Sequence, residues 1–182
     1  MGLWEQFVAS RSSGRLHEAL SMAEPLGRHG EWEFARLSMD GEIETSDAVE
    51  MAVQGLGVPV IGAFVADSDA AAIYFAEPSG APGYLAINRS YDDSDEEHTV
   101  QWLDLDAHRA AADALARWAA VSTEMKPSSD AIVAALAKLE DPELGAELGE
   151  RHILFAEDGL RAVLQDLLGL PLDRAVFAAG DS

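Results

Sequence analysis

The feature that most constrains the fold is an almost uninterrupted apolar run at residues 58–65 (VPVIGAFV). Such a run is typical of a strand that is covered on both faces of a sheet. Two further strand-like segments follow it, at residues 70–76 (AAAIYFA) and 84–88 (YLAIN), after short links rich in Asp, Ser, Pro and Gly. Links of two to six residues join antiparallel neighbours. The sequence therefore predicts an antiparallel meander centred on the apolar run.

Segments on either side extend this pattern. Residues 31–39 alternate Trp32 and Phe34 with charged residues, which predicts a half-exposed strand. Residues 99–105 (TVQWLDL) predict a further strand after the meander. Between them, Ser46 is a candidate N-cap for a helix that ends near Gly57.

Helical patterns flank the predicted sheet. At the N-terminus, residues 3–9 (LWEQFVA) and 16–23 carry apolar side chains at helical spacing. After Asp106 the apolar period changes to that of a helix. The C-terminal helices are predicted at 106–125, with Val121 on the apolar face, and from 129 to 139, with Ser129 as the candidate cap. Two more are predicted, one from 142 with Asp141 as its cap and one at 160–168, where Gly169 ends it.

These patterns predict an α+β fold: an antiparallel meander of about four to five strands, packed with N-terminal helices and a C-terminal group of three to four helices. The length of 182 residues fits one domain. Within it we expect a helical N-terminal segment (1–30), an acidic sheet region (31–105), a helical region (106–172) and a tail (173–182).

Charge is the feature that bears most on function. The chain has 12 basic and 33 acidic residues, a formal charge of −21. Residues 31–106 contribute −15 of it, with 17 acids against Arg36 and Arg89. This balance argues against direct binding to nucleic-acid phosphates or to an anionic membrane. It would attract a cationic partner, although an acidic surface that serves only solubility has the same composition.

Several classes of chemistry lack support in the sequence. The absence of Cys removes disulfides, thiolate metal sites and a Cys nucleophile. No H-E-x-x-H, G-x-S-x-G, G-x-G-x-x-G or P-loop pattern is present, and no cofactor is predicted. The start of the chain shows no signal-peptide pattern, so the expected location is the cytoplasm. The sequence favours a non-enzymatic role without excluding a carboxylate-based enzyme.

The acidic segment before the last predicted strand is the main candidate site. Asp93, Asp95 and Glu97 have the alternate spacing of a calcium loop, but the residue at the required glycine position is His98. No metal is therefore assigned. The segment is interpreted either as solvated or as a contact surface for a basic partner, and its proposed contact residues are Asp92, Asp93, Asp95, Glu96 and Glu97.

Two tryptophans add to the candidate contact surface. The four tryptophans fall on apolar faces and are interpreted mainly as core residues. Trp32 and Trp102 are the candidate exceptions, because they lie on predicted strands among acidic residues, where an exposed aromatic side chain would suit an interface hot spot. A weaker candidate metal site combines Asp104, Asp106 and His108.

Three functions remain open at this point. The favoured one is an acidic protein-binding module, of the immunity-protein or antitoxin type, that neutralises a basic partner, which could be a toxin. The second is a small-ligand-binding or hydrolytic domain that uses carboxylates in a cleft between sheet and helices. The third is a structural component of a larger assembly. The sequence does not predict the oligomeric state.

Overall fold

A computed structural model of the protein describes residues 5–12, 15–39, 43–66, 70–88, 105–148, 152–153 and 155–176. Its strands are β1 (Glu5–Ser10), β2 (Glu24–His29), β3 (Trp32–Arg36), β4 (Val60–Ala66), β5 (Ala70–Ala76) and β6 (Gly83–Asn88). Its helices are α1 (Leu16–Ala19), α2 (Thr45–Leu56), α4 (Leu105–Ser122), α5 (Ser129–Ala137), α6 (Pro142–Leu148), α7 (Ala156–Leu160), the π-helix η1 (Arg161–Leu167) and α8 (Leu172–Ala175). The predicted α+β class is confirmed.

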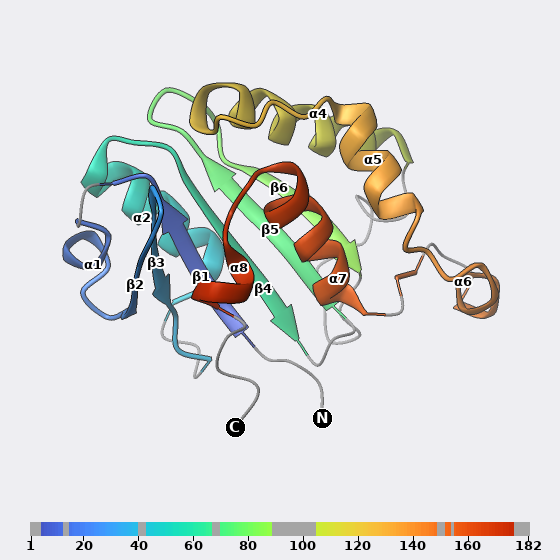
Figure 1. The fold of residues 1–182 in the computed structure, drawn as a ribbon, viewed down its shortest axis with the longest axis horizontal. Helices are drawn as coiled ribbons and strands as arrows, with labels where there is room; N and C mark the ends of the chain where they lie inside the picture. The colour runs from blue at the N-terminus through green and yellow to red at the C-terminus, as the bar shows by residue number, and fades with distance from the viewer. Residues whose placement is uncertain are drawn as a thin grey trace.

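The six strands form one antiparallel sheet in the order β2-β3-β1-β4-β5-β6. The first helices, α1 and α2, pack on one face, while α4, α5, α7 and η1 pack on the other (Figure 1). The meander β4-β5-β6 is the part that the sequence predicted most closely. The apolar run becomes β4, which lies between β1 and β5 and is buried along almost its whole length.

The prediction of N-terminal helices is wrong. Residues 5–10 form β1, which pairs with both β3 and β4, so that Val8 lies between Ala35 and Gly62. In a short apolar segment, helical spacing and a fully buried strand look alike. The two neighbouring strands supply hydrogen-bond partners for the β1 backbone, and this tertiary pairing decides in favour of a strand.

The second predicted helix is shorter than expected. It spans only Leu16–Ala19, and Pro25 and Gly27 lie within the edge strand β2 rather than in a helix terminus. Proline is tolerated on an edge strand because its missing N–H can face solvent, and the register shifts between Pro25 and Gly27. With β1 and β2 added, the sheet begins before residue 31 and has more strands than the predicted meander.

The other local predictions meet mixed outcomes. The helix expected from Ser46 is α2, which ends at Gly57 in the left-handed conformation (φ 66°) that glycine favours. The expected strand 99–105 lies outside the described residues except for Leu105, which begins α4. The helices after the sheet confirm the predicted C-terminal group. Among the described helices, none has the length and apolar composition that a membrane crossing requires.

Candidate functional site

Most residues of the predicted contact surface cannot be located. Residues 92–97 and Trp102 lie outside the described residues, so their role stays a prediction. Trp32 lies on β3, but it is only 7% exposed and packs in the core beneath the C-terminal helices. This burial agrees with the interpretation of the tryptophans as core residues, because β3 is an inner strand whose residues are buried on both faces; a contact role for Trp32 stays a prediction.

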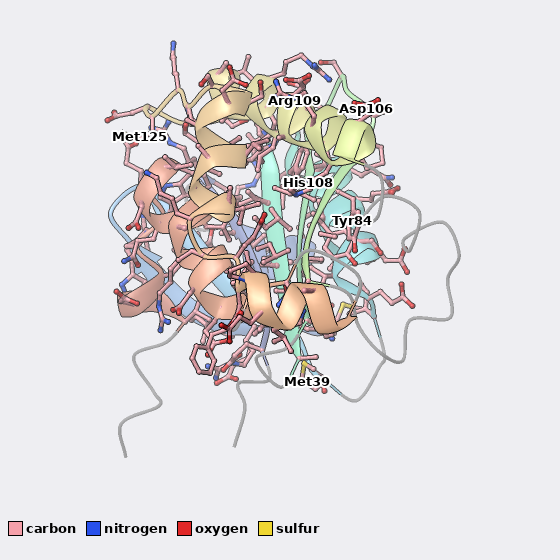
Figure 2. All side chains as sticks on the ribbon, turned by 90° about the vertical axis from the view of Figure 1, so that its right-hand side faces the viewer. Met39, Tyr84, Asp106, His108, Arg109 and Met125 are labelled. Atoms are coloured by element: carbon pink, nitrogen blue, oxygen red, sulfur yellow. The ribbon has the colours of Figure 1, made fainter. Side chains whose placement is uncertain are left out.

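Of the weaker metal candidate, Asp104 lies outside the described residues, and the structure describes Asp106 and His108. Asp106 and His108 are two residues apart in α4, so their side chains point to different sides of the helix. Figure 2 shows Asp106 and Arg109 at the outer surface and His108 on the inner side, where it is buried. Within the described ranges, no group of three or more His, Asp and Glu side chains lies close enough to hold a metal ion.

One hollow, here called the hairpin cleft, has a volume of about 560 Å³. It lies where the β2–β3 turn meets the segment between α4 and α5 and the residues that follow η1. Trp32, Met125 and Leu168 give it apolar walls, and Arg11 and Arg28 are among its charged residues. A cleft of this volume is large enough for a small ligand.

The arginines of the hairpin cleft already have protein partners. Arg11 pairs with Glu31 and also donates to the carbonyl of Ser122 (3.5 Å). Arg28 donates through Nε to the carbonyl of Gly30 (3.1 Å). Arg11 thus links the hairpin, through Glu31, to the end of α4, and its charge is already paired with that of Glu31.

A buried carboxylate on the α1 side has a structural role. Glu33 on β3 is 8% exposed and accepts hydrogen bonds from Ser12 Oγ (2.7 Å) and the backbone N–H of Leu16 (3.1 Å). Ser10 Oγ donates to Ser12 Oγ (2.8 Å). Serine and carboxylate together could suggest catalysis, but Glu33 serves as the hydrogen-bond acceptor for the first turn of α1. The network fixes the connection between β1 and α1.

A second hollow lies on the outer side of α2. This methionine groove, of about 360 Å³, is lined by Met22, Ile43, Asp47, Glu50, Met51 and Gln54. The four α2 residues lie at positions i, i+3, i+4 and i+7, so they share one helix face. The opposite face of α2, which includes Ala48, Val49, Ala52 and Val53, is buried against the sheet. The groove therefore exposes both thioethers and carboxylates.

Sequence reasoning missed the methionine groove. Met22 lies in the turn before β2 and Met51 in the middle of α2, and only the packing of α2 against the sheet brings them to one hollow. The outward stripe of α2 could have been read from its helical period, but nothing in the sequence connects that stripe with Met22.

The known proteins do not supply an assignment. No protein-family model matches the chain, and neither the curated proteins nor the solved structures contain a match.

Proposed function

We propose that this protein is a non-enzymatic binding module that engages a basic partner protein through its acidic surface, in the manner of an immunity protein or antitoxin. The observation that carries the proposal is the separation of acidic side chains from basic ones. Residues 37–88 hold eight acids and not a single Lys, Arg or His. This stretch includes α2 and the meander.

The acids at the start of α2 have no ion-pair partner in the described part of the chain. Glu44, the N-cap of α2, and Asp47 and Glu50 within it are exposed, and among the described residues they take part in no ion pair. On the helices of the other face, Asp130 pairs with Arg109 (2.9 Å) and Asp173 with Arg161 (3.1 Å), whereas Asp113 and Asp166 are unpaired within the described ranges as well, so the α2 side is set apart by the lack of basic residues in 37–88. The α2 side thus keeps its negative charge available for a cationic partner.

The arrangement on α2 also carries a cost to stability. Asp47 and Glu50 are three residues apart on the same helix face, and like charges at this spacing destabilise a helix by about 0.2–0.5 kcal/mol. Asp47 gains something from its place in the first turn, where the helix dipole favours an anion, but Glu50 lies one turn further along. Negative charge that is not neutralised locally, and that slightly destabilises its own helix, is what we expect of a binding surface.

The direct test uses the full chain and its partner. The chain is immobilised, host proteins are captured at low salt, and the purified partner is then used to measure the association rate as a function of salt. We expect a partner with net positive charge whose association rate falls at least about 10-fold as salt screens the field. An association rate that does not respond to salt would contradict the proposal.

Charge variants test whether the acids at the start of α2 cause the salt dependence of the association rate. Replacing the N-cap acid and the first two acids of α2 together (Glu44→Gln, Asp47→Asn and Glu50→Gln) should slow association and make it less dependent on salt. The control is the Asp130→Asn variant, which removes one acid that Arg109 already neutralises and should leave association unchanged. Charge reversal within residues 92–97 tests the sequence-based prediction for that segment in the same assay.

A second candidate function is binding of a small ligand in the hairpin cleft, which its volume and its Trp32 wall favour. Trp32 offers the test, since an occupant of the cleft would change its fluorescence. Ligand screening of the wild type and of Trp32→Phe would show a saturable signal in the first and its loss in the second. A signal that persists in Trp32→Phe would place the ligand elsewhere.

A further inference from the structure

The methionine groove combines two surface properties that the proposed function does not require together. Met22 is 47% exposed and Met51 is 41% exposed, and both line the same hollow as Asp47 and Glu50. Charge alone would attract any cation. The exposed methionine side chains add an apolar surface that can adjust to varied shapes, because methionine is unbranched and polarizable.

We infer that the methionine groove is the docking site for a cationic amphipathic helix of the partner protein. The inference rests on the proposed function and adds to it the site and the chemistry of the segment that binds. Apolar side chains along one face of that helix would contact Met22, Met51 and Ile43. Lys or Arg residues beside them would meet Asp47 and Glu50, which have no basic partner within the described part of the chain.

Charge complementarity and location favour this occupant over the other protein segments that could fill the groove. A second copy of this chain would bring another formal charge of −21 toward the same acids. An added β-strand would need the free edge of a sheet, whereas the groove lies along the outer face of a helix that covers the sheet. An amphipathic helix laid in a groove presents apolar side chains on one face with basic ones beside them, which matches the methionines and carboxylates of this groove.

Peptides of defined composition test the inference on the whole protein. The probe is a helical peptide of leucine and lysine with all leucines on one face. The comparison peptide has the same charge but glutamine in place of leucine. The methyl groups of the five methionines are labelled with ¹³C and followed by NMR. Met125, which is 49% exposed in the hairpin cleft, serves as the internal control.

We expect the leucine–lysine peptide to shift the methyl signals of Met22 and Met51 and to leave that of Met125 in place. The double variant Met22→Gln and Met51→Gln should weaken binding of this peptide about 10-fold, because two apolar contacts are lost at unchanged charge. The matched variant Met125→Gln should leave the affinity unchanged. The NMR measurement on the wild type needs no variant, so it holds even if a substitution disturbs folding.

Two results would overturn the inference, and they differ in what they say about the proposed function. If both peptides bind equally well, in a salt-dependent way, and the methionine variants have no effect, the groove is not the docking site although the acidic surface still binds cations. If neither peptide binds at low salt, the docking site and the acidic binding function both fail.

Discussion

On the face covered by α4, α5, α7 and η1, the strands present large apolar side chains, whereas on the face covered by α1 and α2 the same strands present small ones. One row across the sheet shows this. Phe34, Ala9, Ile61 and Phe75 are neighbours on the first face, and Ala35, Val8 and Gly62 are neighbours on the second, where the larger, half-buried Tyr74 ends the row. Because successive side chains of a strand point to opposite faces, the sheet separates a core of larger side chains from a core of smaller ones.

The two faces also achieve close packing in opposite ways. On the α2 face the glycine lies on the strand: a Cβ at Gly62 of β4 would lie 2.8 Å from side-chain atoms of Thr45 and Val49 in α2. On the other face the glycine lies on the helix: a Cβ at Gly159 of α7 would lie 2.5 Å from Ile87 on β6. Because α2 is a single layer of cover, its outer face meets solvent directly and leaves the methionine groove open.

The largest expected difference between the faces concerns cavities. Leu115 in α4 and Leu16 in α1 are both fully buried. We expect Leu115→Ala to lower the free energy of unfolding by about 3–5 kcal/mol and Leu16→Ala by about 2–3 kcal/mol, because the four-residue α1 can move to fill the space. Urea denaturation measures both. An equal or larger loss at Leu16 would break the comparison.

Each face also has a polar anchor. Asn88 at the end of β6 donates through Nδ2 to the carbonyl of Ile153 (2.6 Å) and accepts through Oδ1 from its N–H (3.0 Å), all in a buried setting. Asn88→Ala leaves the C=O and N–H of Ile153 without hydrogen-bond partners, which lowers the free energy of unfolding by about 1–3 kcal/mol for each group. We expect Glu33→Ala to cost less, because the hydroxyl of Ser12 keeps Ser10 Oγ as a neighbour (2.8 Å), so that only the N–H of Leu16, at the start of the short α1, loses its acceptor. Denaturation of the two variants side by side gives the order, and the reverse order would show that α1 is the more rigidly held element.

Close packing at Gly62 provides a test of the α2 face alone. Gly62→Ala should destabilise the protein by about 1–3 kcal/mol through overpacking. The double variant with Val49→Ala should recover part of this loss relative to Val49→Ala alone, because it removes one of the two methyl groups that the new Cβ meets. Purely additive effects would show that α2 shifts as a whole instead.

The paired acids of the C-terminal helices allow a pH test. Hydrogen bonds from Gln165 (2.9 Å) and Arg161 (3.1 Å), together with the charge of Arg161, lower the pKa of Asp173 below its usual value. Its stabilising contribution is therefore present above the unfolded pKa of about 3.9 and is lost as the pH falls through the folded value.

Since Asp173 is largely exposed, we expect Asp173→Asn to cost less than about 1 kcal/mol near neutral pH. The difference from the wild type should disappear in acid. Thermal melts over a pH series, together with an NMR titration of the carboxyl group, measure both effects. A pKa at or above the usual value for Asp would contradict the described pairing.

The smallest predicted effect is a gain in stability, whereas the other substitutions lower it. Glu50→Gln on α2 removes the repulsion from Asp47 and should raise the free energy of unfolding by about 0.2–0.5 kcal/mol. The same melts that follow Asp173→Asn detect it. If Glu50→Gln destabilises the protein instead, the carboxylate contributes to the fold, and the argument that its charge is kept for a partner loses its support.

The accuracy of the sequence predictions followed how locally each element is specified. The strands β4, β5 and β6 were predicted closely because an apolar run and turn residues mark them, and Asp141 caps α6 as its sequence indicates, through bonds from the N–H groups of Glu143 (2.9 Å) and Leu144 (3.0 Å). The cap of α5 was one residue off, since Ser128 rather than Ser129 accepts from Ala131. In α4, Val121 is exposed where the expected apolar stripe placed it inside.

The sequence by itself determined the α+β class, the meander, the C-terminal helices and the excess of negative charge, because these depend on composition and on patterns within a few residues. Only the tertiary structure decided that residues 5–10 form an inner strand, that Trp32 is buried and that Met22 and Met51 line one groove. Each of these depends on segments distant in the chain, whose pairing and packing energies do not appear in any local pattern.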